Sequence, residues 1–306
     1  MPDRHRNRDL LAELEPVAER LLDRHLAMAK DWLPHEYVPW RLGRDFDTEP
    51  WTPDQPRLTG VAQAAFEVNL LTEDNLPSYH HQLLASFGRD GAWRTWSHRW
   101  TAEEGRHAVV LRDYLLVTRN IDPVALERGR MATLQQGWMP DKTALGLMAY
   151  AAFQELATRI SHRNTGRYSD DPVADKIMVR VAADENLHMM FYRDIVAAAL
   201  QVDPSAAVEA ITEEVIGFDM PGVGIQGFTR KALQMARAGI YDLRIHHDEI
   251  LWPLLRHWNL FALEGLDPQA EQARERLTAH LAKTDRLASR FEAKRMRAAE
   301  AQERAS

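Results

Sequence analysis

The sequence predicts an all-α protein, a helical bundle with a central four-helix core and additional flanking helices. Strand-like alternation and hairpin dipeptides are nearly absent from the 306 residues. Apolar residues recur instead at helical spacing along most of the chain. Two stretches, at 104–107 and 185–188, share the form Glu-x-x-His, and no other Glu-x-x-His occurs in the sequence. Residues three apart lie on one face of a helix, so each pair can reach a common point.

The composition limits the chemistry that the chain can perform. The sequence has no cysteine, which excludes disulfides, thiolate nucleophiles and cysteine-ligated clusters. Any metal must therefore be held by carboxylates and imidazoles. The net charge of −7 argues against a nucleic-acid partner. No apolar run approaches the roughly 20 residues that span a bilayer, so we expect a cytoplasmic protein without integral membrane association.

The first third of the chain is expected to contain two helices joined by a loop. Apolar residues at helical spacing predict an amphipathic helix over 8–30, which should lie on the outside of the core. The proline-rich segment 31–59 reads as an ordered surface loop. A helix then follows over 60–87. Pro77 interrupts its hydrogen bonding, so we expect a kinked continuous helix, the alternative being a simple break at Leu76.

The middle of the chain is expected to form the helices that carry the Glu-x-x-His stretches. Helices are predicted at 92–118, 123–137, 141–166 and 172–200. In the first and last of these, the acid and the histidine fall on the apolar stripe of the helix. Ionisable groups are therefore placed in the protein core.

The last third is also predicted to be helical. Helices are plausible over 204–216, 228–241, 242–259 and 267–297, and the charged segment 290–306 should be a solvated, flexible helix end. No shift in composition marks a domain boundary. We therefore expect a single domain over residues 1–306.

A glutamate upstream of each Glu-x-x-His makes the pattern specific. Glu73 lies 31 residues before Glu104 (104 − 73), and Glu155 lies 30 before Glu185 (185 − 155). A single Glu-x-x-His is usually an exposed acid beside a surface histidine, but two on apolar stripes with matching glutamates indicate a metal site. Four buried carboxylates would repel one another without a cation between them. The expected ligands are Glu73, Glu104, His107, Glu155, Glu185 and His188.

This ligand set is that of ferritin-like bundles with two iron or manganese ions. Longer stretches then resemble one known family, at 72–79 (TEDNLPSY), 100–107 (WTAEEGRH), 153–158 (FQELAT), 160–165 (ISHRNT) and 182–188 (AADENLH). Over about residues 32–276 the sequence is similar to the soluble acyl-acyl carrier protein desaturases, which include the plant stearoyl enzymes and actinobacterial relatives. The resemblance implies that the six residues hold two irons per chain, with Glu104 and Glu185 bridging them.

The resemblance also implies roles for three further residues. Thr158 matches a threonine beside the oxygen-binding position, although without the resemblance a helix threonine bonded to its own backbone is the favoured reading. Asp184 matches an aspartate that orients a ligand histidine. In the family this aspartate links the histidine to a surface tryptophan on an electron path. Trp32 is the match here, and core packing explains it nearly as well.

The implied function is a homodimeric desaturase that inserts a cis double bond into a fatty acyl chain on acyl carrier protein. It would use two irons, dioxygen and electrons from a ferredoxin-type donor. The acyl chain should thread an apolar tunnel lined from 82–87 and 139–148. The ligands alone also allow another ferritin-like di-iron oxygenase, a hydroxylase or N-oxygenase, or a non-catalytic iron-binding or acyl-binding relative.

Departures from the family leave the substrate and the docking surface open. Gly105 replaces the usual asparagine, Asn186 and Leu187 replace a basic pair, and the final strand-forming segment of the plant enzymes is missing. An acidic carrier protein needs a basic docking surface. One candidate cluster contains Arg230, Lys231, Arg237 and Arg244, for which a solvated helix face is an equal explanation.

Overall fold

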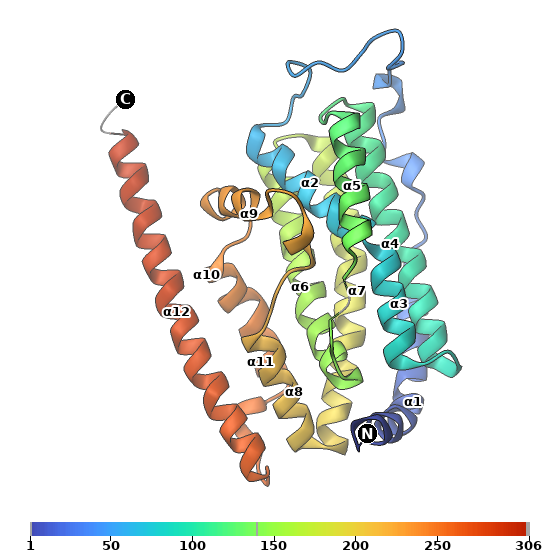
Figure 1. The fold of residues 1–306 in the computed structure, drawn as a ribbon, viewed down its shortest axis with the longest axis vertical. Coiled ribbons are helices and arrows are strands. Elements are labelled where there is room, and N and C mark those ends of the chain that lie inside the picture. Colours follow the sequence, from blue (N-terminus) through green and yellow to red (C-terminus); the bar gives the residue numbers. More distant parts are fainter. Residues whose placement is uncertain (1, 139, 304–306) are drawn as a thin grey trace.

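The all-α prediction is confirmed by a computed structural model that describes residues 2–138 and 140–303 (Figure 1). Within these ranges the chain contains helices and no strand. The α-helices are α1 (Pro2–Met28), α2 (Gly60–Asp74), α3 (Leu76–Phe87), α4 (Gly91–Val117), α5 (Pro123–Gln136), α6 (Ala144–Tyr168), α7 (Pro172–Val202), α8 (Pro204–Ile216), α9 (Phe228–Arg237), α10 (Leu243–Ile245), α11 (Trp252–His257) and α12 (Pro268–Glu303). Short helical turns are η1 (Pro34–Glu36), η2 (Trp40–Leu42), η3 (Pro221–Gly224), η4 (His246–Leu251) and η5 (Leu260–Ala262).

Capping residues explain where several helices begin. Asp122, Asp171 and Asp203 each precede a proline at the start of α5, α7 and α8, and each side chain accepts a hydrogen bond from a backbone N–H of the first turn. Proline is favoured there because its missing N–H would have no partner in the first turn. Thr59 and Thr143 cap α2 and α6 in the same way.

Four helices, α2, α4, α6 and α7, form the centre of the bundle (Figure 1). The most extensive contact is between α6 and α7, which run side by side in the middle of the molecule. Gly166 permits their close approach, since an added Cβ there would lie 2.8 Å from the Cβ of Met178 and 3.2 Å from the Cα of Asp175. The spacing of these two helices therefore depends on a residue without a side chain.

Helix α1 packs one face on the core and leaves the other to solvent, as expected of an amphipathic outer helix. It begins at Pro2, before the predicted start at residue 8. Its residues Leu14, Ala18 and Leu22 are buried in the main apolar cluster. The helix packs mainly on α7 and α4, and His25 in its last turn is also buried. The apolar stripe is complete enough to bury one whole face of the helix.

The prediction of one kinked helix over 60–87 is wrong, and the alternative of a break is confirmed. Helix α2 ends at Asp74 and α3 begins at Leu76, with Asn75 between them. Pro77 lies in the first turn of α3, where its missing N–H leaves no hydrogen bond unmade. The Asn75 N–H bonds the Thr72 carbonyl at 3.3 Å and closes α2. The break places Glu73 in the last turn of α2.

The C-terminal third is more broken up than predicted before residue 260, and more regular after it. The expected helix over 242–259 is divided among α10, the π-helical η4 and α11. Gly239, with a φ of 73°, separates α9 from this region. Helix α12 extends to Glu303, beyond the predicted end at 297, and it packs mainly on α8 along one side of the molecule (Figure 1). Residues 304–306 of the predicted flexible end lie outside the described residues.

Over the described ranges, no helix has both the length and the apolar character needed to cross a membrane.

The close packing of α6 on α7 generates a stability prediction. Gly166→Ala should lower the free energy of unfolding by about 1–3 kcal/mol, because the new methyl group has no room against Met178. Gly129→Ala is the matched control. Its Cβ would lie 3.6 Å from Leu71, an ordinary contact, so that change should stabilise α5 by about 0.5–1 kcal/mol. Denaturant unfolding of both variants is the measurement, and equal effects would contradict the packing argument.

Candidate metal centre

The six predicted ligands come together in two overlapping groups. One group contains Glu73, Glu104, His107 and Glu185, and the other contains Glu104, Glu155, Glu185 and His188. Within each group, one donor atom from every side chain lies within 4.8 Å of the others. All six side chains are buried. Glu104 and Glu185 belong to both groups, which is the arrangement that two bridging carboxylates would have.

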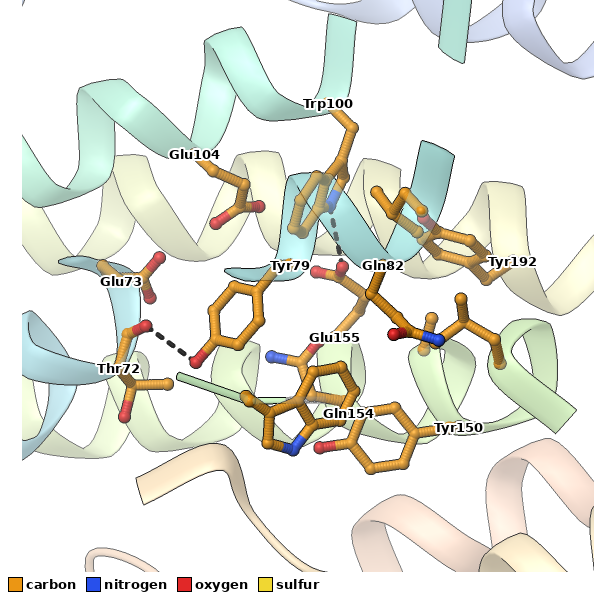
Figure 2. Close-up of a pocket in the computed structure, with 14 residues that line it drawn as sticks. Thr72, Glu73, Tyr79, Gln82, Trp100, Glu104, Tyr150, Gln154, Glu155 and Tyr192 are labelled. Atoms are coloured by element: carbon orange, nitrogen blue, oxygen red, sulfur yellow. Dashed lines mark hydrogen bonds between the residues drawn. The ribbon is translucent and has the colours of Figure 1, made fainter. Parts of the chain in front are cut away.

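Each of the four central helices supplies part of this cluster. Glu73 comes from the last turn of α2, and Glu155 from the middle of α6. The two Glu-x-x-His pairs come from α4 and α7, where their spacing places both members on the inner face. Figure 2 shows Glu73, Glu104 and Glu155 bordering one cavity.

Both histidines turn the same ring nitrogen toward the carboxylates. The Nδ1 of His107 lies 3.3 Å from a Glu104 oxygen and 3.4 Å from a Glu185 oxygen. The Nδ1 of His188 lies 2.8 Å from Glu104 and 3.6 Å from Glu155. The Nε2 atoms therefore face away from the cluster.

The cluster contains buried polar atoms whose needs the protein itself does not meet. The Nδ1 atoms of His107 and His188 have no hydrogen bond of acceptable geometry, and neither do the Oε1 atoms of Glu104 and Glu185. Burying such groups without partners costs several kcal/mol, and the carboxylates also repel one another. Divalent cations with hard oxygen and imidazole ligands would satisfy these atoms. The residues present therefore fit a pair of metal ions such as iron or manganese.

The acidities of the glutamates show the same crowding. Burial, followed by repulsion from Glu185, raises the pKa of Glu104 to about 7. The same two causes raise the pKa of Glu155 well above its usual value. For Glu73, burial acts to raise the pKa, but the nearby imidazole of His107 and the hydrogen bond with His162 outweigh it and lower the pKa to about 2. Protons and metal ions would therefore compete for this cluster.

Asp184 and Trp32 make the contacts that the resemblance implied. The Trp32 indole donates a hydrogen bond to Asp184 Oδ2 at 2.7 Å, and the same oxygen lies 3.4 Å from His107 Nε2. Arg180 binds the other oxygen of Asp184. Trp32 is only 4% exposed, however, so it is not the surface tryptophan that was expected. Tyr37 lies edge-on to the indole, and the guanidinium groups of Arg106 and Arg180 lie over the ring.

Thr158 lies beside the cluster, with its hydroxyl turned to its own helix. The Thr158 hydroxyl lies 3.1 Å from the carbonyls of both Gln154 and Glu155, the backbone-bonded arrangement that was the alternative reading. The residue also lines a cavity together with Glu73. A role beside an oxygen-binding position stays a prediction.

Sequence reasoning missed several polar partners of the ligands. His162 Nε2 lies 3.0 Å from Glu73 Oε1, and the Trp100 indole donates to Glu155 at 2.9 Å. Both residues stand inside the stretches that carry the family resemblance, which was the available signal. Glu103 lies 2.9 Å from the Nε2 of both His188 and His25. The position of Glu103 directly before Glu104 could have indicated its role. Nothing in the sequence indicates its contact with His25, which is 78 residues away.

Two cavities flank the ligands and share Thr72 and Glu73 in their walls. The first is also lined by Glu104, Glu155 and a set of mainly apolar and aromatic side chains, including Tyr79, Trp138, Tyr150 and Tyr192 (Figure 2). The second lies beside Thr158, under η3 and α9. Of the stretches predicted to line a tunnel, Gln82, Leu83 and Leu147 line the first cavity, and Met139 lies outside the described residues.

The basic cluster suggested as a docking site is partly neutralised. Lys231 pairs with Glu67 at 2.6 Å, and Arg244 pairs with Asp285 at 2.7 Å. Arg230 and Arg237 are exposed on α9. Two of the four basic side chains are therefore paired with acids, and the other two lie on the solvent-exposed face of α9.

Comparisons with known proteins point to one family. The model of a family described as fatty acid desaturase matches residues 6–306. DesA1 of Mycobacterium tuberculosis, which is named as an acyl-[acyl-carrier-protein] desaturase, is 45% identical over 300 residues, or 94% of this chain and 89% of that protein. The chloroplastic stearoyl-[acyl-carrier-protein] 9-desaturase 5 of Oryza sativa subsp. japonica is 30% identical over 319 residues, which cover 94% of this chain and 79% of the rice protein. The X-ray structure of DesA2 from M. tuberculosis superposes with a TM-score of 0.72 at 30% identity, over 87% of this chain and 99% of DesA2.

The shared glutamates generate a prediction about metal stoichiometry. Anaerobic titration with Fe²⁺ should load about two ions per chain, because the ligands form two overlapping groups. Glu185→Gln should abolish tight binding of both ions, whereas Glu73→Gln should weaken only one. Glu214→Gln is the control, since Glu214 is a buried acid that pairs with Lys142 outside the cluster. Equal losses in the Glu73 and Glu185 variants would contradict the assignment of shared ligands.

The raised pKa of Glu104 generates a second prediction. Below pH 7 this carboxyl is protonated in the metal-free protein and must release its proton before it can bind a cation. This one proton should make the affinity for Fe²⁺ about tenfold lower at pH 6 than at pH 8, and the raised pKa values of His107 and His188 should add to the decrease. Competition with a chelator at the two pH values measures the change. An affinity that does not vary with pH would show that the metal displaces no proton from Glu104.

Proposed function

Because the chain belongs to the fatty acid desaturase family, we propose that it introduces a cis double bond into a fatty acyl chain carried on acyl carrier protein. The observation that carries the proposal is the position of Glu73, Glu104 and Glu155. These three carboxylates belong to the six-residue cluster and also form part of the wall of a mainly apolar cavity. A chain in that cavity would lie against the metal centre.

The reaction removes one hydrogen atom from each of two adjacent methylene carbons. Dioxygen accepts four electrons, two from these C–H bonds and two from an external donor, and two further protons complete two molecules of water. Two iron ions, when bound by the six ligands, would supply the activation of dioxygen that this oxidation requires. The protein's own task is to hold the ligands, place the acyl chain and keep water away.

The outer contacts of the ligands hold the centre in one geometry. The Asp184 carboxylate lies next to His107 Nε2, which favours a proton on that nitrogen and leaves Nδ1 free to face a metal. Trp32 and Arg180 hold the carboxylate in place. The indole of Trp32 is nearly parallel to the His107 ring, with 6.4 Å between their centroids. We propose that electrons from a ferredoxin-type donor enter by this route.

We propose that an acyl chain extends from one cavity to the other past the ligands. Both contain Thr72 and Glu73 in their walls, so a chain that occupies both must pass this point. Tyr150 and Tyr192 lie on the side of the first cavity away from Glu73 (Figure 2). The depth that the chain can reach there would decide which methylenes stand opposite the metal centre. The apolar walls also exclude water from the reacting carbons.

The partners follow from the same chemistry. The substrate is presented by acyl carrier protein, which is acidic, so the exposed Arg230 and Arg237 remain candidates for the docking surface. The homodimer and the cytoplasmic location remain predictions.

A single-turnover experiment tests the proposed function. The protein is loaded anaerobically with Fe²⁺, reduced, mixed with acyl carrier proteins that bear chains of several lengths, and exposed to oxygen. Mass spectrometry of the released chains should show the loss of two hydrogens and a double bond at one position. Glu104→Gln should abolish this product, because Glu104 belongs to both ligand groups. Chains that gain one oxygen atom instead would identify a hydroxylase, and iron uptake without any chain oxidation would indicate a storage or binding protein.

A further inference from the structure

His188 has an acidic partner on its outer nitrogen that matches the partner of His107. Glu103 Oε2 lies 2.9 Å from His188 Nε2. Both residues are almost fully buried, at 2% exposure for Glu103 and 0% for His188. Asp184 has the same relation to His107 on the other side of the cluster. Each ligand imidazole therefore lies between the ligand carboxylates and one outer carboxylate.

The two outer acids follow one rule of position. Glu103 directly precedes Glu104 on α4, yet it contacts the histidine of α7. Asp184 directly precedes Glu185 on α7, and it contacts the histidine of α4. Consecutive residues on a helix point about 100° apart, so the residue before an inward-facing ligand can reach the flank of the neighbouring helix. Each helix thus supplies the outer partner of the other helix's ligand.

Side chains from α1 and α4 hold Glu103 in place. His25 Nε2, at the end of α1, lies 2.9 Å from the same Oε2 atom that contacts His188. Arg99 Nε donates to the other oxygen of Glu103 at 2.7 Å. The His25 ring is fixed edge to face against Trp96, with 5.1 Å between their centroids. Glu103 is therefore held on one oxygen by the buried His25 and on the other by the partly exposed Arg99.

Arg106 lies between the two outer carboxylates, those of Glu103 and Asp184. One of its terminal nitrogens is 3.6 Å from Glu103 Oε1 and 3.6 Å from Asp184 Oδ2. Its guanidinium carbon also lies 5.1 Å from the centre of the Trp32 ring. Arg106, which stands between Glu104 and His107 in the sequence of α4, thus places a positive charge between the two outer carboxylates.

We propose that Glu103 is a positioning residue for His188, and that His25 holds Glu103 in place. An acceptor at Nε2 selects the tautomer with its proton on that nitrogen, and the Nδ1 lone pair is then directed at Glu104, Glu155 and Glu185. The inference rests on the proposed di-metal centre. It assigns the buried His25, in the last turn of α1, to the support of that centre, as Trp32 supports the opposite side.

The cluster of His25, Glu103 and His188 has the composition of a metal site by itself. His188 would then have to bind metal through both ring nitrogens, while its Nδ1 already faces the main cluster. If Glu103 instead only accepts a hydrogen bond, His188 uses Nε2 for that bond and keeps Nδ1 for the main cluster. We therefore assign the three side chains to positioning, and a third bound metal is an outcome that the experiment can reveal.

Metal binding without substrate tests the proposal independently of turnover. The variants are Glu103→Leu, which removes the acceptor, and Glu103→Gln, whose amide oxygen can still accept one hydrogen bond. The probe is ⁵⁷Fe²⁺ added anaerobically, with affinity measured by chelator competition and each iron environment by Mössbauer spectroscopy. Glu103→Leu should weaken one of the two ions by about 10–100-fold and change one spectral component, and Glu103→Gln should fall between it and the parent. Asp184→Asn should change the other component.

A variant outside α4 keeps the test valid if Glu103→Leu fails to fold. His25→Phe leaves Glu103 in place but removes its partner, so it should weaken the same iron by a smaller factor, and His25→Gln should restore most of the affinity. The proposal is overturned if Glu103 and Asp184 variants change the same component. It is also overturned if Glu103→Leu binds both ions as the parent does, or if the parent binds a third ion that this variant loses. A parent protein that binds two ions but oxidises no acyl chain would reject the proposed function alone.

Discussion

The structure depends on the burial of four carboxylates and two imidazoles at the centre of a helical bundle. Glu104 and Glu185 lie between the two halves of the ligand set, and each has an oxygen without a hydrogen-bond partner. Apolar packing elsewhere must offset the cost of this burial until a cation binds. The largest apolar cluster includes residues of α1, α4, α6 and α7, three of which also carry ligands. The helices that hold the ligands are thus also those that stabilise the fold.

The same constraint links the metal centre to the proposed substrate cavity. Glu73 stands at the end of α2 because the chain breaks at Asn75, and α3 then continues along the cavity with Tyr79, Gln82 and Leu83. Glu155 borders the cavity from α6 and accepts a hydrogen bond from Trp100. A ligand carboxylate on one wall and apolar side chains on the others place a hydrocarbon chain beside an oxidising centre. The specificity of an enzyme built in this way would reside in the cavity walls and not in the ligands.

Spacing along the sequence was sufficient to predict the six residues that the structure brings into one cluster, because each Glu-x-x-His encodes a local helical geometry and each upstream glutamate repeats at nearly the same interval. The helix starts at Asp122, Asp171 and Asp203 were also readable, since their capping depends on neighbouring residues. The His25 and Glu103 pair was not, because 78 residues separate them and no local pattern records which helix covers which face. The burial of Trp32 likewise depends on how a long loop folds back. Pro77 allowed both a kink and a break, and only tertiary packing decided between them.

Diffraction at the iron absorption edge from crystals loaded anaerobically with Fe²⁺ tests the central claim most directly. The account predicts two anomalous peaks within the cluster, about 3.5–4 Å apart. One should contact His107 and Glu73, the other His188 and Glu155, and both should contact Glu104 and Glu185. A single peak, or iron bound by His25 and Glu103 in place of the predicted set, would contradict the account.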